Sequence, residues 1–333
     1  MDARTVTLYA FCSAKGGVGK STLAVVAAKL LAAQGRACAL IDADLTGTSL
    51  ADGLGLRAPR VALDDGGLML EAPPTGEHFS LEETQRLRDA RDRVDPEQWP
   101  PPPPPFFNDA LLFYRSEEQT TECRLDALFW RHEREDKVLY LPSSPLPRDV
   151  SVALGWLYQD GSQWLSRFAW LIDALCTQVP ALTDVVIDLP PGLYGFTRDT
   201  LTLMSRVSLG LPLPEGSPDW PHDGLTFRVR PFLVMTEDSN DLAVALEYFA
   251  ANYPRLRELV PLVNRERVGL RATSERVQKR FEQRLGRLNL ESHLVGVSES
   301  PLLAKIFVDN DVRVDKMSEE EQRSLRRSLR LEG

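Results

Sequence analysis

The sequence lacks paired cysteines and long apolar runs, and each absence argues against a class of protein. Its four cysteines form no CxxC pair and stand far apart, at Cys12, Cys38, Cys123 and Cys176. Such spacing supports neither a zinc knuckle nor a redox pair nor a disulfide scaffold, and fits reduced, buried thiols. No stretch approaches the ~18 uninterrupted apolar residues of a spanning helix, and residues 1–4 lead directly into a strand-like run instead of a signal peptide. We therefore expect a cytoplasmic protein.

A net positive charge is also absent. The 333 residues carry a formal charge of -9, which argues against a protein that coats nucleic acid with its whole surface. The charge is concentrated in residues 57–137, which hold 18 acidic and 11 basic residues and 10 of the 24 prolines. We call residues 57–137 the acidic segment. We predict that it is a proline-rich insertion of unknown fold, placed in a body that comprises residues 1–56 and 138–333.

Within the acidic segment, the run Pro100 to Pro105 can only be polyproline II. It is either a stiff spacer or a ligand for an aromatic-lined groove on a partner. Apolar residues at 111–114 and 125–130 could bury a small satellite core.

Outside the acidic segment, the sequence repeatedly reads strand, loop, helix. Short apolar runs bounded by polar, glycine or proline residues predict strands at 6–11, 37–41, 138–141, 184–187, 232–235, 259–263 and 294–297. Helices are predicted between them, notably at 21–34, 164–178 and 240–251. The prolines of residues 209–230 suggest a long loop or hairpin. This alternation predicts an α/β fold with a doubly wound, mostly parallel sheet flanked by helices, and ligands at the carboxyl ends of the strands.

The first predicted strand is followed by a glycine-rich loop, Ala14 to Thr22, that runs directly into a helix. The strict G-x-x-x-x-G-K-[ST] pattern fails because Ala14 replaces the first glycine. The chemistry is nonetheless present, since three glycines let successive backbone N–H groups face inward and the helix adds its positive dipole end. Lys20 would neutralise the β- and γ-phosphates, Ser21 would hold Mg²⁺, and Thr22 would reach the α-phosphate.

This loop resembles the deviant Walker A motif of the ParA/MinD family of P-loop ATPases. The resemblance implies that Lys15 crosses a dimer interface to the partner's nucleotide, so that two chains sandwich ATP. Lys15 and Lys20 would then act catalytically. The implied ATP-binding residues of the loop are Lys15, Gly16, Gly17, Val18, Gly19, Lys20, Ser21 and Thr22.

Further motifs extend the resemblance to residues 4–56 and about 138–314. Asp42 and Asp44 follow the second strand, where the family carries switch I. By resemblance, Asp44 orients the attacking water and Asp42 belongs to the metal shell. Asp188-Leu189-Pro190-Pro191-Gly192 resembles Walker B and switch II, with Asp188 on Mg²⁺ and Gly192 near the γ-phosphate. Asn264 and Arg265 resemble an element that binds adenine; an Asn side chain can pair a donor and an acceptor with the adenine edge.

The switch phrases are most similar to the Mrp-type iron–sulfur carriers. Those proteins hold their cluster with a CxxC pair, which this chain lacks, so we expect no Fe–S cluster. The family's partition proteins instead bind nonspecific DNA through basic residues. Residues 264–290 carry a net charge of +5, and a DNA contact would use Arg267, Arg271, Arg276, Lys279, Arg280, Arg284 and Arg287. A solvated charged face is the alternative. The tail 318–333 has three leucines and no aromatic anchor, so we do not expect membrane binding.

The resemblance therefore implies an ATP-hydrolysing dimerisation switch that uses ATP and Mg²⁺, with slow, partner-stimulated turnover. It would position or partition a cargo in the cytoplasm, with nonspecific DNA, and thus the nucleoid, as an open alternative. Two other functions remain open. One is a regulatory protein whose acidic segment docks a protein partner in an ATP-gated way, and the other is a nucleotide-binding scaffold with little hydrolysis.

Overall fold

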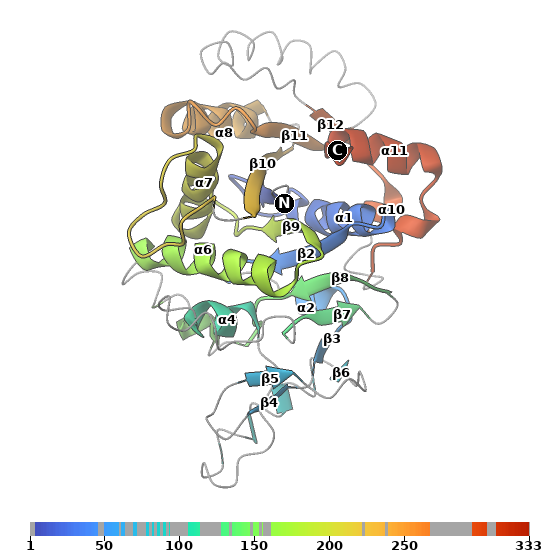
Figure 1. Cartoon of the computed structure of the whole chain (residues 1–333). Coiled ribbons are helices and arrows are strands. Elements are labelled where there is room, and N and C mark those ends of the chain that lie inside the picture. Colours follow the sequence, from blue (N-terminus) through green and yellow to red (C-terminus); the bar gives the residue numbers. More distant parts are fainter. Residues whose placement is uncertain are drawn as a thin grey trace.

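The computed structural model describes residues 4–45, 50–59, 106–113, 128–132, 135–146, 161–221, 224–236, 239–266, 295–304 and 311–332, with short pieces between 61 and 93 and between 149 and 155. A 10-stranded sheet runs through the molecule in the order β12-β11-β10-β1-β9-β2-β8-β7-β3-β6, and β4 and β5 form a separate pair (Figure 1). The strands are β1 (Arg4–Cys12), β2 (Ala37–Asp42), β3 (Leu56–Pro59), β4 (Val61–Leu63), β5 (Met69–Glu71), β6 (His78–Phe79), β7 (Trp130–His132), β8 (Glu135–Leu141), β9 (Leu182–Asp188), β10 (Leu225–Met235), β11 (Val260–Glu266) and β12 (Val295–Ser298). The helices are α1 (Lys20–Ala33), α2 (Leu50–Gly53), α4 (Phe107–Phe113), α6 (Gly161–Gln178), α7 (Gly195–Ser208), α8 (Ser239–Asn252), α10 (Pro301–Ala304), the 3₁₀ turn η4 (Val314–Lys316) and α11 (Glu319–Ser328).

The centre of the sheet is parallel. All seven strands predicted from the apolar runs are present, and from β12 to β8 every neighbouring pair is parallel. The predicted α/β class with a mostly parallel sheet is therefore confirmed. One boundary was wrong, because β10 begins at Leu225, inside the proline-containing stretch read as a loop or hairpin. Polar residues interrupt its first half, but that half pairs with β1 from Arg4 onward, and this pairing makes it a strand.

Alternate residues of the central strands face two separate hydrophobic layers, as the pleat of a strand requires. In β1, Leu8 and Ala10 pack into the layer covered by α4, α6, α7 and α8. Tyr9 and Phe11 pack into the layer covered by α1, α2 and α11. Figure 1 shows these two groups of helices on opposite sides of the sheet. Both faces are thus covered, and this explains why the strands read as continuous apolar runs.

The described parts of the acidic segment are built into this body. β7 pairs antiparallel with β8, and β3 pairs antiparallel with β7, so the segment extends the main sheet at one edge. Its buried apolar residues join the two layers above instead of forming a satellite core of their own, with Leu111, Leu128 and Phe129 in one layer and Phe106 and Trp130 in the other. The residues Pro100 to Pro105 lie outside the described residues. The division of the chain into a body and an insertion stays a prediction.

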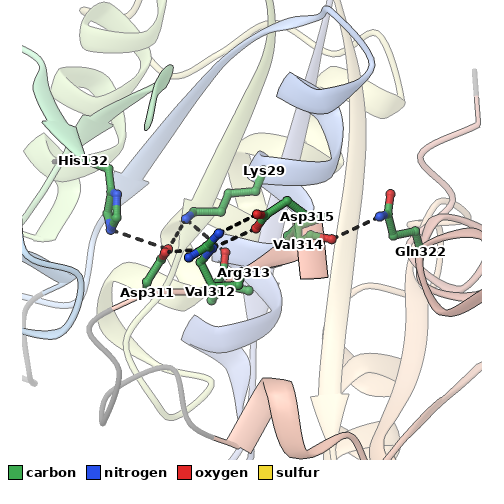
Figure 2. A network of polar contacts seen from close by, with 8 residues as sticks. All are labelled: Lys29, His132, Asp311, Val312, Arg313, Val314, Asp315 and Gln322. Atoms are coloured by element: carbon green, nitrogen blue, oxygen red, sulfur yellow. Dashed lines mark hydrogen bonds and ion pairs between the residues drawn. The ribbon is translucent and has the colours of Figure 1, made fainter. Parts of the chain in front are cut away.

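A buried polar network ties three distant parts of the chain together (Figure 2). Lys29 lies in α1, which is buried along almost its whole length, and its Nζ is 2.5 Å from Asp311 Oδ1. The same ammonium donates to Val312 O at 3.1 Å, and His132 Nε2 from β7 lies 3.5 Å from Asp311 Oδ1. Lys29, Asp311 and His132 are each at most 5% exposed. A buried ammonium needs such a partner, so this network fixes the C-terminal segment on α1.

The C-terminal helix α11 closes the second layer. Ser318 and Glu321 form a reciprocal capping box at its start. Three leucines are buried in the layer that includes α1: Leu325 within the helix, and Leu329 and Leu331 just after the helix ends. These leucines are therefore not exposed to a lipid surface. Among the described residues, no helix is both long and apolar enough to cross a membrane.

Candidate nucleotide site

The carboxyl ends of four neighbouring strands meet at one edge of the sheet. The register pairs Asp188 at the end of β9 with Phe11 in β1 and with Asp42 at the end of β2. On the other side of β2, Ile41 pairs with Leu141, the last residue of β8. The loops that follow these strands must therefore lie side by side. This is the edge where ligands bind in doubly wound sheets.

The glycine-rich loop spans the gap between β1 and α1. Gly17 and Gly19 have φ angles of 76° and 87°, which favour glycine over other residues. A Cβ atom at Gly19 would lie 2.2 Å from Asn264 Nδ2, so no larger residue fits there without displacing Asn264. Ser13 Oγ donates to Lys15 O at 2.8 Å and holds the start of the loop. The helix begins at Lys20, so its first N–H groups and its dipole end point into the loop.

Lys20 and Asp188, which sequence reasoning placed on the phosphates and on the metal, are in direct contact. Lys20 Nζ lies 2.7 Å from Asp188 Oδ1, and both side chains are buried. Burial alone would lower the pKa of Lys20, but the Asp188 carboxylate, with Asp44 and Asp42 further away, raises that pKa above its usual value. The ammonium is therefore charged, and it neutralises a cluster that is otherwise acidic.

Asp42 is held by donors from two loops. Its Oδ1 accepts from Asp44 N at 3.1 Å, and its Oδ2 accepts from Leu50 N at 2.9 Å and from Ser143 Oγ at 2.8 Å. Burial raises the pKa of Asp42 to about 7, and the charge of Asp188 adds to this rise, while the bonds from Leu50 and Ser143 oppose it. Asp42 and Asp188 stand level on neighbouring strands, and two buried carboxylates placed in this way favour a cation beside them.

The other loop residues take up positions around this cluster. Gly192 N donates to Ser13 O at 2.9 Å, which places switch II against the start of the phosphate loop. Gly192 has a φ of 97°, and Tyr194 packs where its Cβ would be. Asp44 is buried beside Asp42, and Lys15 is exposed. Ser21 and Thr22 occupy the first turn of α1.

Asn264 contacts the phosphate loop itself. Its Nδ2 donates to Val18 O at 2.8 Å, and the residue is 5% exposed. The structure thus brings Asn264 to the nucleotide loop, but from within β11, which runs to Glu266 instead of ending before Asn264 as predicted. Its pairing with adenine stays a prediction. The side chain of Arg265 and residues 46–49 of switch I lie outside the described residues. So do the seven candidate DNA contacts, Arg267, Arg271, Arg276, Lys279, Arg280, Arg284 and Arg287.

Sequence reasoning missed two residues of this site. Ser13 supports the phosphate loop, and Ser143 donates to Asp42 from the loop after β8. A signal for Ser143 was present, because it follows a predicted strand, and in a doubly wound sheet that position marks the ligand edge. What the sequence could not give was the neighbour relation between β8 and β2.

The N-terminal part of the chain, residues 5–85, matches the ParA family model described as the NUBPL iron-transfer P-loop NTPase. MinD from Pyrococcus horikoshii, solved with Mg-ADP, has a TM-score of 0.53 and 15% identity, and the match covers 98% of this chain and 94% of that one. MinD from Aquifex aeolicus has a TM-score of 0.52 and 14% identity, with 98% and 96% covered. The fold is that of the ParA/MinD-type P-loop ATPases. A ParA family ATPase from Chlorobium tepidum is similar too, with a TM-score of 0.50, 12% identity, and 97% and 96% covered.

These comparisons confirm the resemblance that the sequence motifs indicated. The family model spans both the phosphate loop and the switch I carboxylates, while Asp188, Gly192 and Asn264 lie beyond the matched residues. No curated protein matches the chain. At these identities, the solved structures establish the ParA/MinD-type fold and its connectivity.

Proposed function

We propose that this chain is an ATP-binding and hydrolysing dimerisation switch of the ParA/MinD type that positions or partitions a cargo. One observation carries the proposal. A glycine-rich loop, a buried lysine and two buried carboxylates converge at the carboxyl edge of the sheet, with Lys20 Nζ 2.7 Å from Asp188 Oδ1. This is the set of groups that binds the phosphates and the metal of a nucleotide in P-loop proteins.

The residues present fit Mg²⁺ bound with a nucleotide. Asp42 and Asp188 supply carboxylate oxygens, Ser21 supplies a hydroxyl at the start of α1, and hard oxygen donors are what Mg²⁺ prefers. The ion would neutralise charge on the phosphates when bound. Lys20 would exchange its contact with Asp188 for the β- and γ-phosphates, and the backbone N–H groups of residues 16–22 would donate to them.

Hydrolysis and dimerisation are assigned to two further residues. Asp44 is buried next to Asp42 and would hold the attacking water by accepting its proton. Lys15 is exposed, so it is accessible to a second copy of the chain. In the proposal it contacts the nucleotide of the partner, so ATP joins the two copies.

An iron–sulfur cargo is not part of the proposal, although the matching family model is named for iron transfer. The described cysteines, Cys12, Cys38 and Cys176, are all buried. Burial raises the pKa of Cys12 and of Cys176 to about 12, so both are neutral thiols, and the thiolate is the form that binds metal. The chain also has no CxxC pair.

A second candidate is an ATP-gated regulator whose acidic segment docks a protein partner. It is favoured by the contact between α4 of that segment and the loop after β8, where Phe107 N donates to Pro142 O at 2.8 Å. Through this contact the segment reaches the loop that holds Asp42.

Light scattering with ADP and with ATP, with and without DNA at two salt concentrations, tests the proposal. ATP should convert a monomer to a dimer, and salt-sensitive DNA binding only with ATP would support partitioning over DNA. Loss of partner binding on deletion of residues 57–137 would favour the regulator. Tight ATP binding without turnover would indicate a scaffold, and failure to bind ATP would refute all three.

A further inference from the structure

The loop after β8 connects the nucleotide site to the acidic segment. On the site side, Ser143 donates twice to Asp42 Oδ2, from its Oγ at 2.8 Å and from its backbone N at 3.4 Å. Ser143 is 1% exposed and Asp42 is 1% exposed. Water therefore cannot replace these donors, and the orientation of the Asp42 carboxylate depends on where the loop lies.

On the other side, α4 of the acidic segment holds the same loop through two hydrogen bonds. Phe107 N donates to Pro142 O at 2.8 Å, and Ser144 N donates to Asn108 Oδ1 at 2.8 Å. The two bonds bracket Ser143 in sequence. A continuous path of contacts thus runs from Asn108 through the backbone of Ser144 and Ser143 to Asp42, and from there to the cluster with Asp188.

Helix α4 is firmly placed and can act as an anchor for the loop. The ring of Phe107 meets Trp164 of α6 edge to face, with ring centroids 5.9 Å apart, and Phe168 at 6.1 Å. Phe106 packs against Trp130 of β7 at 4.9 Å. The residues around the start of α4 are all at most 5% exposed, namely Phe106, Phe107, Asn108, Ala110 and Leu111.

Asn108 is an unexpected residue for so apolar a position. Its Oδ1 accepts from Ser144 N, but its Nδ2 is buried and has no hydrogen-bond partner among the described residues. A buried amide with an unpaired donor costs stability, and an apolar side chain of similar volume would avoid that cost. What Asn108 contributes in return is the acceptor for the backbone N–H of Ser144, which ties the loop to α4.

We propose that Ser143 and Asn108 are positioning residues of the nucleotide site. Ser143 orients the Asp42 carboxylate toward the magnesium ion of a bound nucleotide, and Asn108, from the acidic segment, holds Ser143 in place. This inference rests on the proposed function, in which Asp42 belongs to the metal shell. It makes the acidic segment a structural part of the site, so that displacing α4 loosens Asp42.

The test measures the Mg²⁺ concentration that half-saturates the binding of a fluorescent ADP analogue, together with binding in EDTA. In Ser143→Ala, the half-saturating Mg²⁺ concentration should rise about 10- to 100-fold, the usual loss when a residue that supports a metal ligand is removed. Binding in EDTA should stay unchanged, because the phosphate loop is untouched. A merely structural defect would weaken both. Ser144→Ala is the matched control, since its Oγ bonds Asp149 and not Asp42.

Asn108 is tested by Asn108→Leu, which keeps the volume and removes the acceptor. The half-saturating Mg²⁺ concentration should again rise, and in the double variant with Ser143→Ala the rise should be smaller than the product of the two single effects. Asp109→Ala measures what a general loosening of α4 contributes, because Asp109 Oδ2 accepts from Phe106 N at 2.7 Å. Its shift should be smaller than that of Asn108→Leu, since both hydrogen bonds from α4 to the loop remain. Thermal unfolding confirms that each variant is folded at the assay temperature.

Three results would overturn the inference while leaving the proposed function intact. The first is a wild-type half-saturating Mg²⁺ concentration in folded Ser143→Ala. The second is a rise in the double variant that equals the product of the two single rises. The third is a rise in Asp109→Ala as large as that in Asn108→Leu. Absence of any Mg²⁺-dependent nucleotide binding by the wild-type chain would instead overturn the proposed function, and this inference with it.

Discussion

Lys20 and Asp188 form a buried ion pair, with Nζ and Oδ1 2.7 Å apart, at the point where α1 begins and β9 ends. The register of β9 against β1 and β2 produces this contact, since Asp188 stands level with Phe11 and with Asp42. Each charge compensates the other, and the two side chains are only 7% and 2% exposed. The pair therefore joins the stability of the fold to its proposed chemistry.

Removing one partner of this pair should harm both stability and binding. Lys20→Ala leaves Asp188 buried and unpaired, so the free energy of unfolding should fall by about 3–5 kcal/mol. Nucleotide binding should be lost as well. In the double variant Lys20→Met/Asp188→Asn, chemical denaturation should show most of the stability restored while calorimetry still detects no ATP binding. Normal ATP affinity in Lys20→Ala would rule out the phosphate-loop assignment.

Lys15 should separate nucleotide binding from dimerisation. Lys15→Ala should bind ATP with near wild-type affinity and stay monomeric, because Lys15 is exposed and, in the proposal, contacts the nucleotide of the second copy. Converting mostly monomer to mostly dimer requires a preference of ~5 kcal/mol, which cross-subunit contacts to the γ-phosphate must supply. Light scattering with ATP checks this, with the exposed Lys316→Ala as control. An ATP-dependent dimer in Lys15→Ala would contradict the sandwich.

Asp44→Ala should bind ATP and dimerise but not hydrolyse. The loss of a group that accepts the proton of the attacking water should slow phosphate release by about 100-fold or more. Sizing in ATP should then show a persistent dimer. Turnover at the wild-type rate would move the water-positioning role to another residue.

In the absence of divalent cations, the raised pKa of Asp42 should make the free energy of unfolding fall as pH rises. Burial, aided by Asp188, raises its pKa from 3.8 to about 7, so between these values the folded protein holds a proton that the unfolded chain has released. Stability from this group is therefore present at low pH and lost as pH rises to about 7. Asp42→Asn cannot ionise and so lacks this pH dependence. The free energy of unfolding of Asp42→Asn, relative to that of the wild type, should therefore rise by roughly a few kcal/mol as pH rises across this window. Urea denaturation in EDTA from pH 5 to 8 measures it, and a constant difference would disprove it.

In the network around Asp311, loss of one charged partner should cost more stability than replacement of both partners by apolar residues. Asp311→Ala leaves the Lys29 ammonium buried without its carboxylate and should cost about 3–5 kcal/mol. Lys29→Met combined with Asp311→Leu should recover most of this in denaturation experiments. As a control, Asp315→Ala breaks only the more exposed pair with Arg313 and should cost about 0–1 kcal/mol. Equal losses for Asp311→Ala and Asp315→Ala would contradict this account.

The sequence alone determined the central strands and the phosphate loop, because the signal for each lies within a short run of consecutive residues. A parallel strand covered on two faces must be apolar throughout, and a loop that wraps phosphates must have glycines and a lysine at fixed spacing before a helix. The runs that became β1, β2 and β9 and the residues from Lys15 to Thr22 could therefore be identified without neighbours.

Only the tertiary structure decided which loops meet at the site. The pairing of β2 with β8 brings Ser143 to Asp42, and the packing of α4 against α6 brings Asn108 to Ser144. The residue types alone do not signal such a role, since serine and asparagine are both common in loops; only the position of Ser143 after a predicted strand pointed to the ligand edge. Strand order and helix packing depend on contacts between residues far apart in the chain, and a local pattern carries no information about them.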